Sequence, residues 1–142
     1  MQISSRFTIA IHMLTCMETF KEDYKITSDF LASSINVNPV IIRRILSQLR
    51  DAGMIEVKRG TGGASVIKPL SEITFLDVYQ AVECIEENTL FHFHEIRIRP
   101  VRWEKVIHNI LDDKLLRVQQ AMERELASIT LEDVMGDLEK YL

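Results

Sequence analysis

The hydrophobic pattern is clearest over residues 38–52, where apolar positions recur with the period of a helix. They fall at i, i+3, i+4 and i+7, which puts Ile42, Ile45, Leu46 and Leu49 on one face. Asn38 is a favourable N-cap, and Pro39 suits the first helical position, where its missing N–H costs nothing. Gly53 can then end the helix in a left-handed conformation. The pattern predicts a short amphipathic helix with one buried stripe.

The opposite face of this helix is basic. It is rich in side chains that bond to base edges or phosphates in DNA complexes, and it consists of Val40, Arg43, Arg44, Ser47, Gln48 and Arg50. An ordinary surface helix with solvated charges would show a similar face. The helix alone therefore leaves both interpretations open, and the neighbouring segments decide between them.

A shorter helix is predicted over 27–35. Thr27 or Ser28 can cap it, and its apolar side consists of Phe30, Leu31 and Ile35. Asn36 follows where two helices must turn sharply, and asparagine tolerates the left-handed conformation better than most residues. The two segments have helix–turn–helix spacing, with 38–52 in the recognition position. The free N–H groups at the start of the shorter helix, near Ser28, can attract phosphate.

A β-hairpin is predicted directly after the recognition helix. Residues 54–59 alternate, with Ile55 and Val57 on one face, and 65–68 form a returning strand. The turn between them, Gly-Thr-Gly-Gly at 60–63, is flexible enough to approach a phosphate chain closely. A plain hairpin turn is the alternative interpretation, but a glycine-rich hairpin after a basic helix favours a DNA-binding wing.

Basic residues stand at the mouth of this hairpin loop, namely Lys58 and Arg59. An arginine beside such a loop can enter a narrow minor groove, where the negative potential is enhanced. We therefore expect the loop to contact DNA together with the recognition helix.

Two more helices are expected around this motif. Phe7, Ile11 and Leu14 recur at helical spacing within 3–20. Thr74 and Asp77 are spaced as a capping box at the start of a helix that extends to about residue 82.

The longest periodic pattern covers 104–129 and predicts a helix nearly 40 Å long at about 1.5 Å per residue. Such a helix is longer than a small domain needs, so we expect it to pack against a second copy through Ile107, Leu111, Leu115, Val118, Met122 and Leu126. A long helix packed within one chain is the alternative.

A short last helix is predicted after it. Thr130 and Asp133 are spaced to cap its start, and its apolar side consists of Leu131, Val134, Leu138 and Tyr141.

Charge is distributed unevenly along the 142 residues, whose net charge is −4. Residues 1–70 carry nine Lys/Arg against six Asp/Glu, whereas 71–142 carry eight against fifteen. Within 38–68 there are six basic and two acidic residues, and a DNA backbone responds to this local patch more than to the total. No signal peptide or membrane-spanning run is visible. We therefore expect a cytoplasmic protein with no membrane partner.

Residues 86–102 lose periodicity and hold His92, His94 and Glu95, which could be read as metal ligands. No further convergent ligands are visible, so a polar loop is the preferred interpretation, and a small effector bound near it is left open. Cys84 could sense redox signals, but its acidic neighbours favour an inert thiol. Because there are no paired catalytic carboxylates, no nucleophile with a local base and no P-loop, we expect no enzyme activity.

Four motifs together resemble the Rrf-two family (IscR/NsrR type) of bacterial winged-helix transcriptional regulators. They are NPVIIRRIL at 38–46, LRDAGMI at 49–55, KRGTGGA at 58–64 and ITFLDVYQAV at 73–82. The resemblance covers essentially the whole chain. It implies a homodimer that binds operator DNA, usually as a repressor, with the recognition helix in the major groove and the wing, 58–65, in the minor groove.

The DNA-contacting positions expected from the residues and the resemblance together are Ser28, Asn38, Val40, Arg43, Arg44, Ser47, Arg50, Lys58, Arg59, Gly60, Thr61, Gly62 and Gly63. A winged-helix module that binds another protein, without direct DNA readout, is the second hypothesis. The two differ in salt dependence, which is steep for DNA binding.

The chain departs from the family in its cysteines. Iron–sulfur members have three cysteines before the long helix, but this chain has none from 85 to 142, and Cys84 stands alone. A single thiolate cannot hold a cluster that takes about four ligands, so we expect a cysteine-poor member without the cluster. The sequence thus predicts a mainly α fold with a small β-hairpin, made of a winged helix-turn-helix DNA-binding domain (1–84), a variable sensing loop (85–102) and dimerisation helices (103–142).

Overall fold

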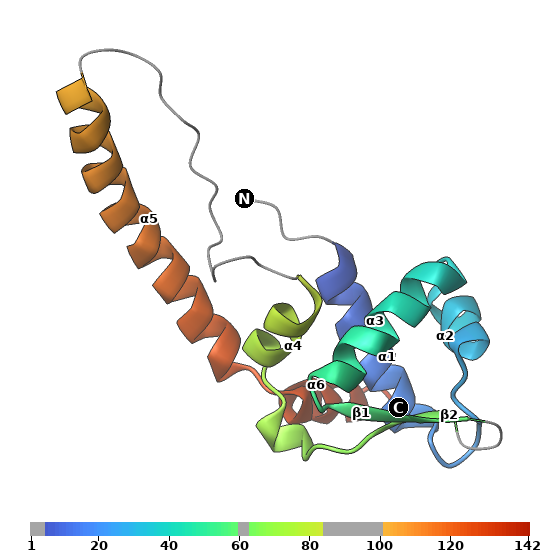
Figure 1. The fold of residues 1–142 in the computed structure, drawn as a ribbon. Coiled ribbons are helices and arrows are strands. Elements are labelled where there is room, and N and C mark those ends of the chain that lie inside the picture. Colours follow the sequence, from blue (N-terminus) through green and yellow to red (C-terminus); the bar gives the residue numbers. More distant parts are fainter. Residues whose placement is uncertain (1–4, 60–62, 84–100) are drawn as a thin grey trace.

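The structure, a computed structural model, describes residues 5–59, 63–83 and 101–142, with side chains from 105 onward in the last range. Its elements in chain order are α1 (Ser5–Phe20), α2 (Ser28–Ile35), α3 (Pro39–Asp51), β1 (Ile55–Lys58), β2 (Gly63–Val66), a 3₁₀ turn η1 (Leu70–Glu72), α4 (Phe75–Val82), α5 (Val101–Ser128) and α6 (Leu131–Glu139). The mainly helical fold with one antiparallel hairpin is the predicted one (Figure 1).

The apolar stripe of α3 is buried, as predicted. Ile42, Ile45, Leu46 and Leu49 join the main core. Apolar burial of this kind is the dominant favourable term in folding. The same core takes Met13 and Leu14 from α1 and Val78 from α4. The recognition helix is therefore held by helices on either side of it in the sequence.

The predicted ends of α2 and α3 are also confirmed. Thr27 is the N-cap of α2, and Asn36 turns left-handed with φ of 62°. The Asn38 Oδ1 atom accepts a hydrogen bond from the Val40 backbone N–H at 2.8 Å. Gly53, with φ of 80°, takes the left-handed conformation that ends α3. The ends of both helices are therefore defined by residues that are close to them in the sequence.

The strands of the hairpin differ in their bounds from the prediction. The returning strand is 63–66 rather than 65–68, and Lys58 pairs with Gly63. Ile55 is buried, but Val57 on the same face is 42% exposed because it lies beyond the edge of the core. Residues 60–62 of the loop lie outside the described residues.

Residues 130–139 return to the winged-helix core. Thr74 and Thr130 form an isolated antiparallel bridge, the Phe75 N–H donates to the Ile129 carbonyl at 2.9 Å, and the Leu131 N–H donates to the Ile73 carbonyl at 2.8 Å. Both Ile73 and Leu131 are fully buried. The sequence grouped 103–142 as dimerisation helices, whereas these contacts join α6 to the first domain.

One residue of the expected apolar stripe of α6 does not lie on the buried side of the helix. Tyr141 lies past the end of α6 and is 87% exposed, because the helix stops at Glu139. Val134 and Leu138 remain half-buried, as the pattern predicted.

Helix α5 projects from the rest of the molecule (Figure 1). It begins at Val101, three residues before the predicted start, and most of the expected sensing loop, 84–100, lies outside the described residues. Its second half packs on α4, where Gln119 is buried and donates to the Glu123 carboxylate at 3.1 Å. Within the described residues, no helix has the length and apolarity to cross a membrane.

The junction between α5 and α6 should contribute measurably to stability. Thr130 Oγ1 accepts from the Asp133 N–H at 3.1 Å, and the Asp133 carboxylate accepts from the Thr130 N–H at 2.9 Å. We expect Thr130→Ala to lower the free energy of unfolding by about 1 kcal/mol, since one backbone donor loses its partner. Urea denaturation measures this. Ser128→Ala, which removes an exposed hydroxyl two residues earlier, is the control, and an equal loss in both variants would contradict a role for the capping box.

Candidate nucleic-acid interface

The outer face of α3 is exposed and basic. Val40 is 66% exposed, and Arg43, Arg44, Ser47 and Arg50 are exposed beside it. Burial of the opposite stripe forces these side chains outward, because both faces belong to one helix. An α-helix fits a DNA major groove, where exposed arginine and serine side chains can bond to base edges.

Gln48 is an exception to the predicted outer face. It is half-buried, and its Nε2 donates to the Val82 carbonyl at 3.5 Å. The side chain lies on the α4 side of the helix, so it ties α3 to the C-terminal end of α4 rather than facing DNA. The sequence pattern missed this because it could not show which neighbour lies beside each edge of the helix.

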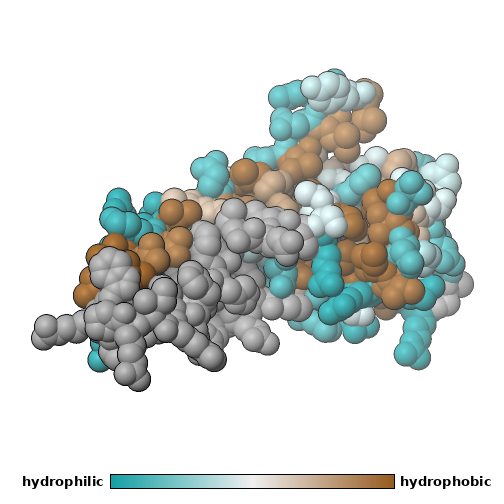
Figure 2. All heavy atoms as spheres, turned by 90° about the horizontal axis from the view of Figure 1, so that it is seen from above, coloured by the Kyte–Doolittle hydropathy of each residue, from teal (hydrophilic) through white to brown (hydrophobic). Residues whose placement is uncertain are grey.

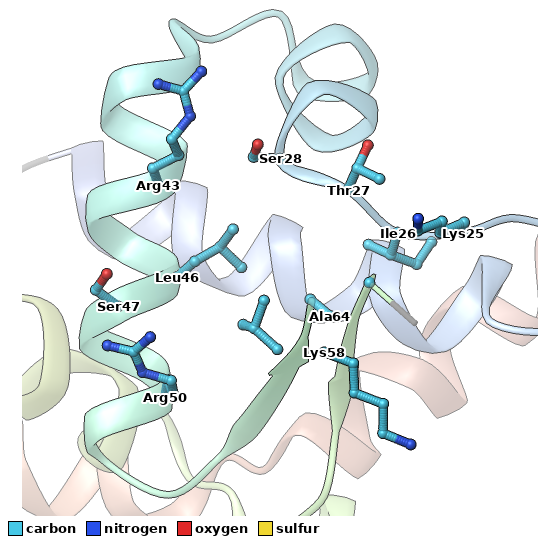
Figure 3. Close-up of a pocket in the computed structure, with 12 residues that line it drawn as sticks. Lys25, Ile26, Thr27, Ser28, Arg43, Leu46, Ser47, Arg50, Lys58 and Ala64 are labelled. Atoms are coloured by element: carbon cyan, nitrogen blue, oxygen red, sulfur yellow. The ribbon is translucent and has the colours of Figure 1, made fainter. Parts of the chain in front are cut away.

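A groove of about 320 Å³ lies between α3, the hairpin and the chain that leads into α2 (Figure 3). It is bordered by four cationic side chains, and none of its lining residues is acidic. The lining consists of Lys25, Ile26, Thr27, Ser28, Arg43, Leu46, Ser47, Arg50, Val57, Lys58, Gly63 and Ala64. The groove thus combines a cationic rim with an apolar floor.

The two adjacent arginines of α3 lie differently with respect to this groove. Arg43 and Arg50 lie on the same side of α3 and line the groove, whereas Arg44 does not line it. This follows from the step of roughly 100° between successive residues of a helix. Arg43 is the one that faces the hairpin and α2.

Three predicted contact residues have side-chain partners within the protein, and one of them is Arg50, which lies 3.5 Å from the Asp51 carboxylate. The Asn38 oxygen is occupied by the cap of α3, and Lys58 lies 3.6 Å from the Glu56 carboxylate. The Lys58 side chain extends outward from the hairpin (Figure 3). Arg59 is exposed next to the undescribed loop residues 60–62. Both basic side chains of the hairpin are therefore accessible at the surface.

Gly63 is buried for a reason that the sequence did not reveal. With φ of 65°, a Cβ atom at this residue would lie 2.7 Å from the Ile26 backbone oxygen. The next residue, Ala64, donates its N–H to that same oxygen at 2.8 Å. The glycine was expected to let the backbone approach phosphate. Its observed close approach is to the backbone before α2.

The lining residues that precede α2 were not predicted as contacts, namely Lys25, Ile26 and Thr27. Lys25 lies in the connection between α1 and α2. Its placement depends on the hydrogen bond between Ile26 and Ala64, residues that are distant in the sequence. A lysine immediately before a helix–turn–helix cap was the only local signal available.

Among the described residues, no group of three or more His, Cys, Asp or Glu side chains is arranged to hold a metal ion. Cys16, on α1, is buried in the core. Burial raises the pKa of its thiol, which disfavours the thiolate that metals bind. His92, His94 and Cys84 lie outside the described residues.

The fold and this basic surface define a winged helix-turn-helix protein, and comparison with known proteins narrows the class. The Rrf2 family model, described as "Iron-dependent Transcriptional regulator", matches residues 3–137. YwnA of Bacillus subtilis, by name an HTH-type transcriptional regulator, is 42% identical over 136 residues, which cover 96% of this chain and 98% of YwnA.

Solved structures of similar fold point to the same class of protein. The crystal structure of a protein described as DNA-binding is 39% identical, with a TM-score of 0.75, and the match covers 92% of this chain and 99% of that one. IscR of T. potens has the same fold, with a TM-score of 0.71 at 18% identity over 99% of this chain and 90% of its own. The chain therefore belongs to the Rrf2 family, which confirms the resemblance to the Rrf-two family, and it is a DNA-binding transcriptional regulator.

The geometry at Gly63 generates a stability prediction. Gly63→Ala should destabilise the protein by about 1–3 kcal/mol, because the new Cβ would collide with Ile26 backbone atoms in a left-handed conformation. Gly136→Ala is the matched control. That glycine lies within α6 with no atom near its Cβ position, so alanine should stabilise the protein by about 0.5–1 kcal/mol. Thermal unfolding compares the two, and a neutral Gly63→Ala would contradict the observed packing.

Proposed function

We propose that this regulator acts as a homodimeric repressor on a pseudo-palindromic operator in the cytoplasm. Two copies of α3 enter successive major grooves, about 34–36 Å apart, and the wing, 58–65, reaches the adjacent minor groove. The observation that carries the proposal is the exposed basic face of α3, which continues into a groove bordered by cations from α3, the hairpin and the segment before α2.

Different side chains of α3 make different kinds of DNA contact in this proposal. Arg43 and Arg50 border the groove, so they hold the phosphate backbone. Arg44 and Val40 lie farther around the exposed face, where base edges are within reach. An arginine that forms two hydrogen bonds to guanine supplies sequence discrimination, whereas a phosphate contact supplies affinity alone.

This division can be measured once operator fragments have been selected from genomic DNA by the purified protein. We expect Arg44→Ala to lose about 1–3 kcal/mol at one guanine-containing position and to relax the sequence preference there. Arg43→Ala should weaken binding to all sequences about equally. Titration against single-base operator variants distinguishes the two. If neither substitution affects binding, the proposed docking is wrong.

The dimer is proposed to form through α5. Apolar side chains are exposed on this projecting helix, including Val118 at 54%, with Val106, Ile110, Leu111 and Leu116. Hydrophobic atoms are visible at the projecting end of the molecule (Figure 2). Of the predicted contact residues, Leu111 and Val118 are exposed, while Ile107, Leu115, Met122 and Leu126 are half-buried. A solitary chain would leave this apolar surface in water.

Charge placed in this stripe should separate the copies. Val118→Glu would bury an unpaired carboxylate in the dimer, so we expect a monomer in sedimentation experiments and a large loss of operator affinity. Gln120→Glu adds the same group to the same helix at an exposed position outside the predicted stripe, and it should remain dimeric. A dimer that tolerates Val118→Glu would contradict the proposed interface.

We further propose that the protein acts without an iron–sulfur cluster and without enzyme activity, although its family model is described as iron-dependent. The chain has two cysteines. One of them, Cys16, is buried with a raised thiol pKa, so Cys84 is the one candidate thiolate. Catalysis has no visible support, since neither a paired carboxylate site nor an activated nucleophile is apparent in the sequence.

The cofactor proposal has a direct test. Protein purified without oxygen should contain no stoichiometric iron or acid-labile sulfide, and its operator affinity should be the same in the Cys84→Ala variant. Iron and sulfide bound in stoichiometric amounts by the native protein, and lost in Cys84→Ala, would contradict the proposal.

A further inference from the structure

The position of the groove between α3 and the hairpin indicates where the DNA backbone passes. This inference rests on the proposed function. The major and minor grooves of a duplex are separated by one sugar–phosphate strand. If α3 enters the major groove and the wing enters the adjacent minor groove, that strand must pass between α3 and the hairpin. The cavity of about 320 Å³ lies in this position (Figure 3).

The chemistry of the groove matches such a strand. Four of its lining residues are cationic, namely Lys25, Arg43, Arg50 and Lys58. Arg43 and Arg50 lie on α3, where Arg50 is also 3.5 Å from the Asp51 carboxylate, and the Lys58 side chain extends outward from the hairpin. Three hydroxyl residues also line it, namely Thr27, Ser28 and Ser47, and hydroxyls are common phosphate ligands. The Thr27 hydroxyl already accepts the Phe30 N–H, so Ser28 and Ser47 are the candidates. None of the lining residues is acidic. The charge pattern suits an extended anion better than a neutral or cationic ligand.

The floor of the groove is apolar, and it consists of Ile26, Leu46, Val57 and Ala64. Val57 is 42% exposed although it belongs to β1, so it offers a hydrocarbon surface without breaking the core. A deoxyribose ring has an apolar face of similar size. Cations at the rim and hydrocarbon at the floor thus correspond to the alternating phosphate and sugar of a DNA backbone.

The Lys25 backbone is held in place before any ligand binds. The adjacent residue, Ile26, is buried, and its carbonyl accepts the Ala64 N–H at 2.8 Å. Gly63 packs against the same peptide. The segment before α2 is therefore tied to β2, so Lys25 is carried at a set distance from the hairpin. Preorganisation of this kind lowers the entropy cost of binding.

We propose that this groove seats the DNA strand that separates the two grooves, with Lys25 contacting a phosphate and Val57 packing on a deoxyribose. Neither contact depends on the base sequence. Lys25 and Val57 therefore add affinity and set the register of the protein on the duplex, while α3 reads the bases.

The first test compares two lysines that lie four residues apart in the sequence. Lys25→Ala should weaken binding several-fold to all operator variants. It should also reduce the slope of log affinity against log salt by about one for each copy that binds. Lys21→Ala is the control. Lys21 pairs with Glu18 at 3.1 Å and does not line the groove, so both affinity and slope should be unchanged.

The second test compares two exposed apolar residues of the hairpin region. Val57→Ser should weaken binding to all sequences without changing the salt slope, since no charge is removed. Ile67→Ser is the control, because Ile67 is 53% exposed and does not line the groove. Circular dichroism of each variant establishes that the fold is intact before binding is compared.

A free nucleotide could supply the same sugar and phosphate chemistry. Thymidine 3′,5′-bisphosphate is therefore titrated as a competitor of operator binding, and it should compete only weakly because it provides a small part of the strand. Strong competition would overturn the proposal in favour of a small-molecule site.

Unchanged affinity and salt slope in both Lys25→Ala and Val57→Ser would also overturn the proposal while leaving the proposed function intact. In contrast, failure of the native protein to bind DNA would contradict the proposed function itself.

Discussion

The arrangement of the functional surface depends on the burial of one stripe of α3. Ile42, Ile45 and Leu49 are fully buried in the core, and each would cost several kcal/mol to truncate, on the order of 2–5 for an isoleucine or leucine cut to alanine. Because this stripe cannot rotate outward, the arginines on the rest of the helix are held at the surface. The basic face is thus a consequence of core packing rather than an independent feature.

Two long-range joints then position the elements around α3. The hydrogen bond between the Ala64 N–H and the Ile26 carbonyl ties the hairpin to the segment before α2. The bridge between Thr74 and Thr130 ties the end of α5 to the start of α4. The first joint shapes the groove, and the second determines where α5 leaves the domain. Since α5 is the proposed dimer contact, the second joint also influences the separation of the two recognition helices.

Local signals made much of this molecule predictable from the sequence. The caps at Asn38, Thr74 and Thr130 and the left-handed Asn36 each depend on a few neighbouring residues, so they could be recognised without a structure. Three of the unpredicted features involve partners that are distant in the sequence. Gln48 binds the end of α4, Gly63 packs on Ile26, and α6 returns to the first domain through Leu131. Hydrophobic periodicity identifies the buried face of an element, but it cannot identify what lies against that face.

The central claim is that two basic helix-and-hairpin surfaces, paired through α5, bind one operator. A hydroxyl-radical footprint of the native protein on its selected operator tests this most directly, because it reports contact with the sugar–phosphate backbone at single-nucleotide resolution. We predict two symmetric sets of protected positions, centred about 10 base pairs apart or at a multiple of that spacing. In each set, the strongest protection should fall on the strand between the major groove and the neighbouring minor groove. A single protected set, or protection without two-fold symmetry, would contradict the account.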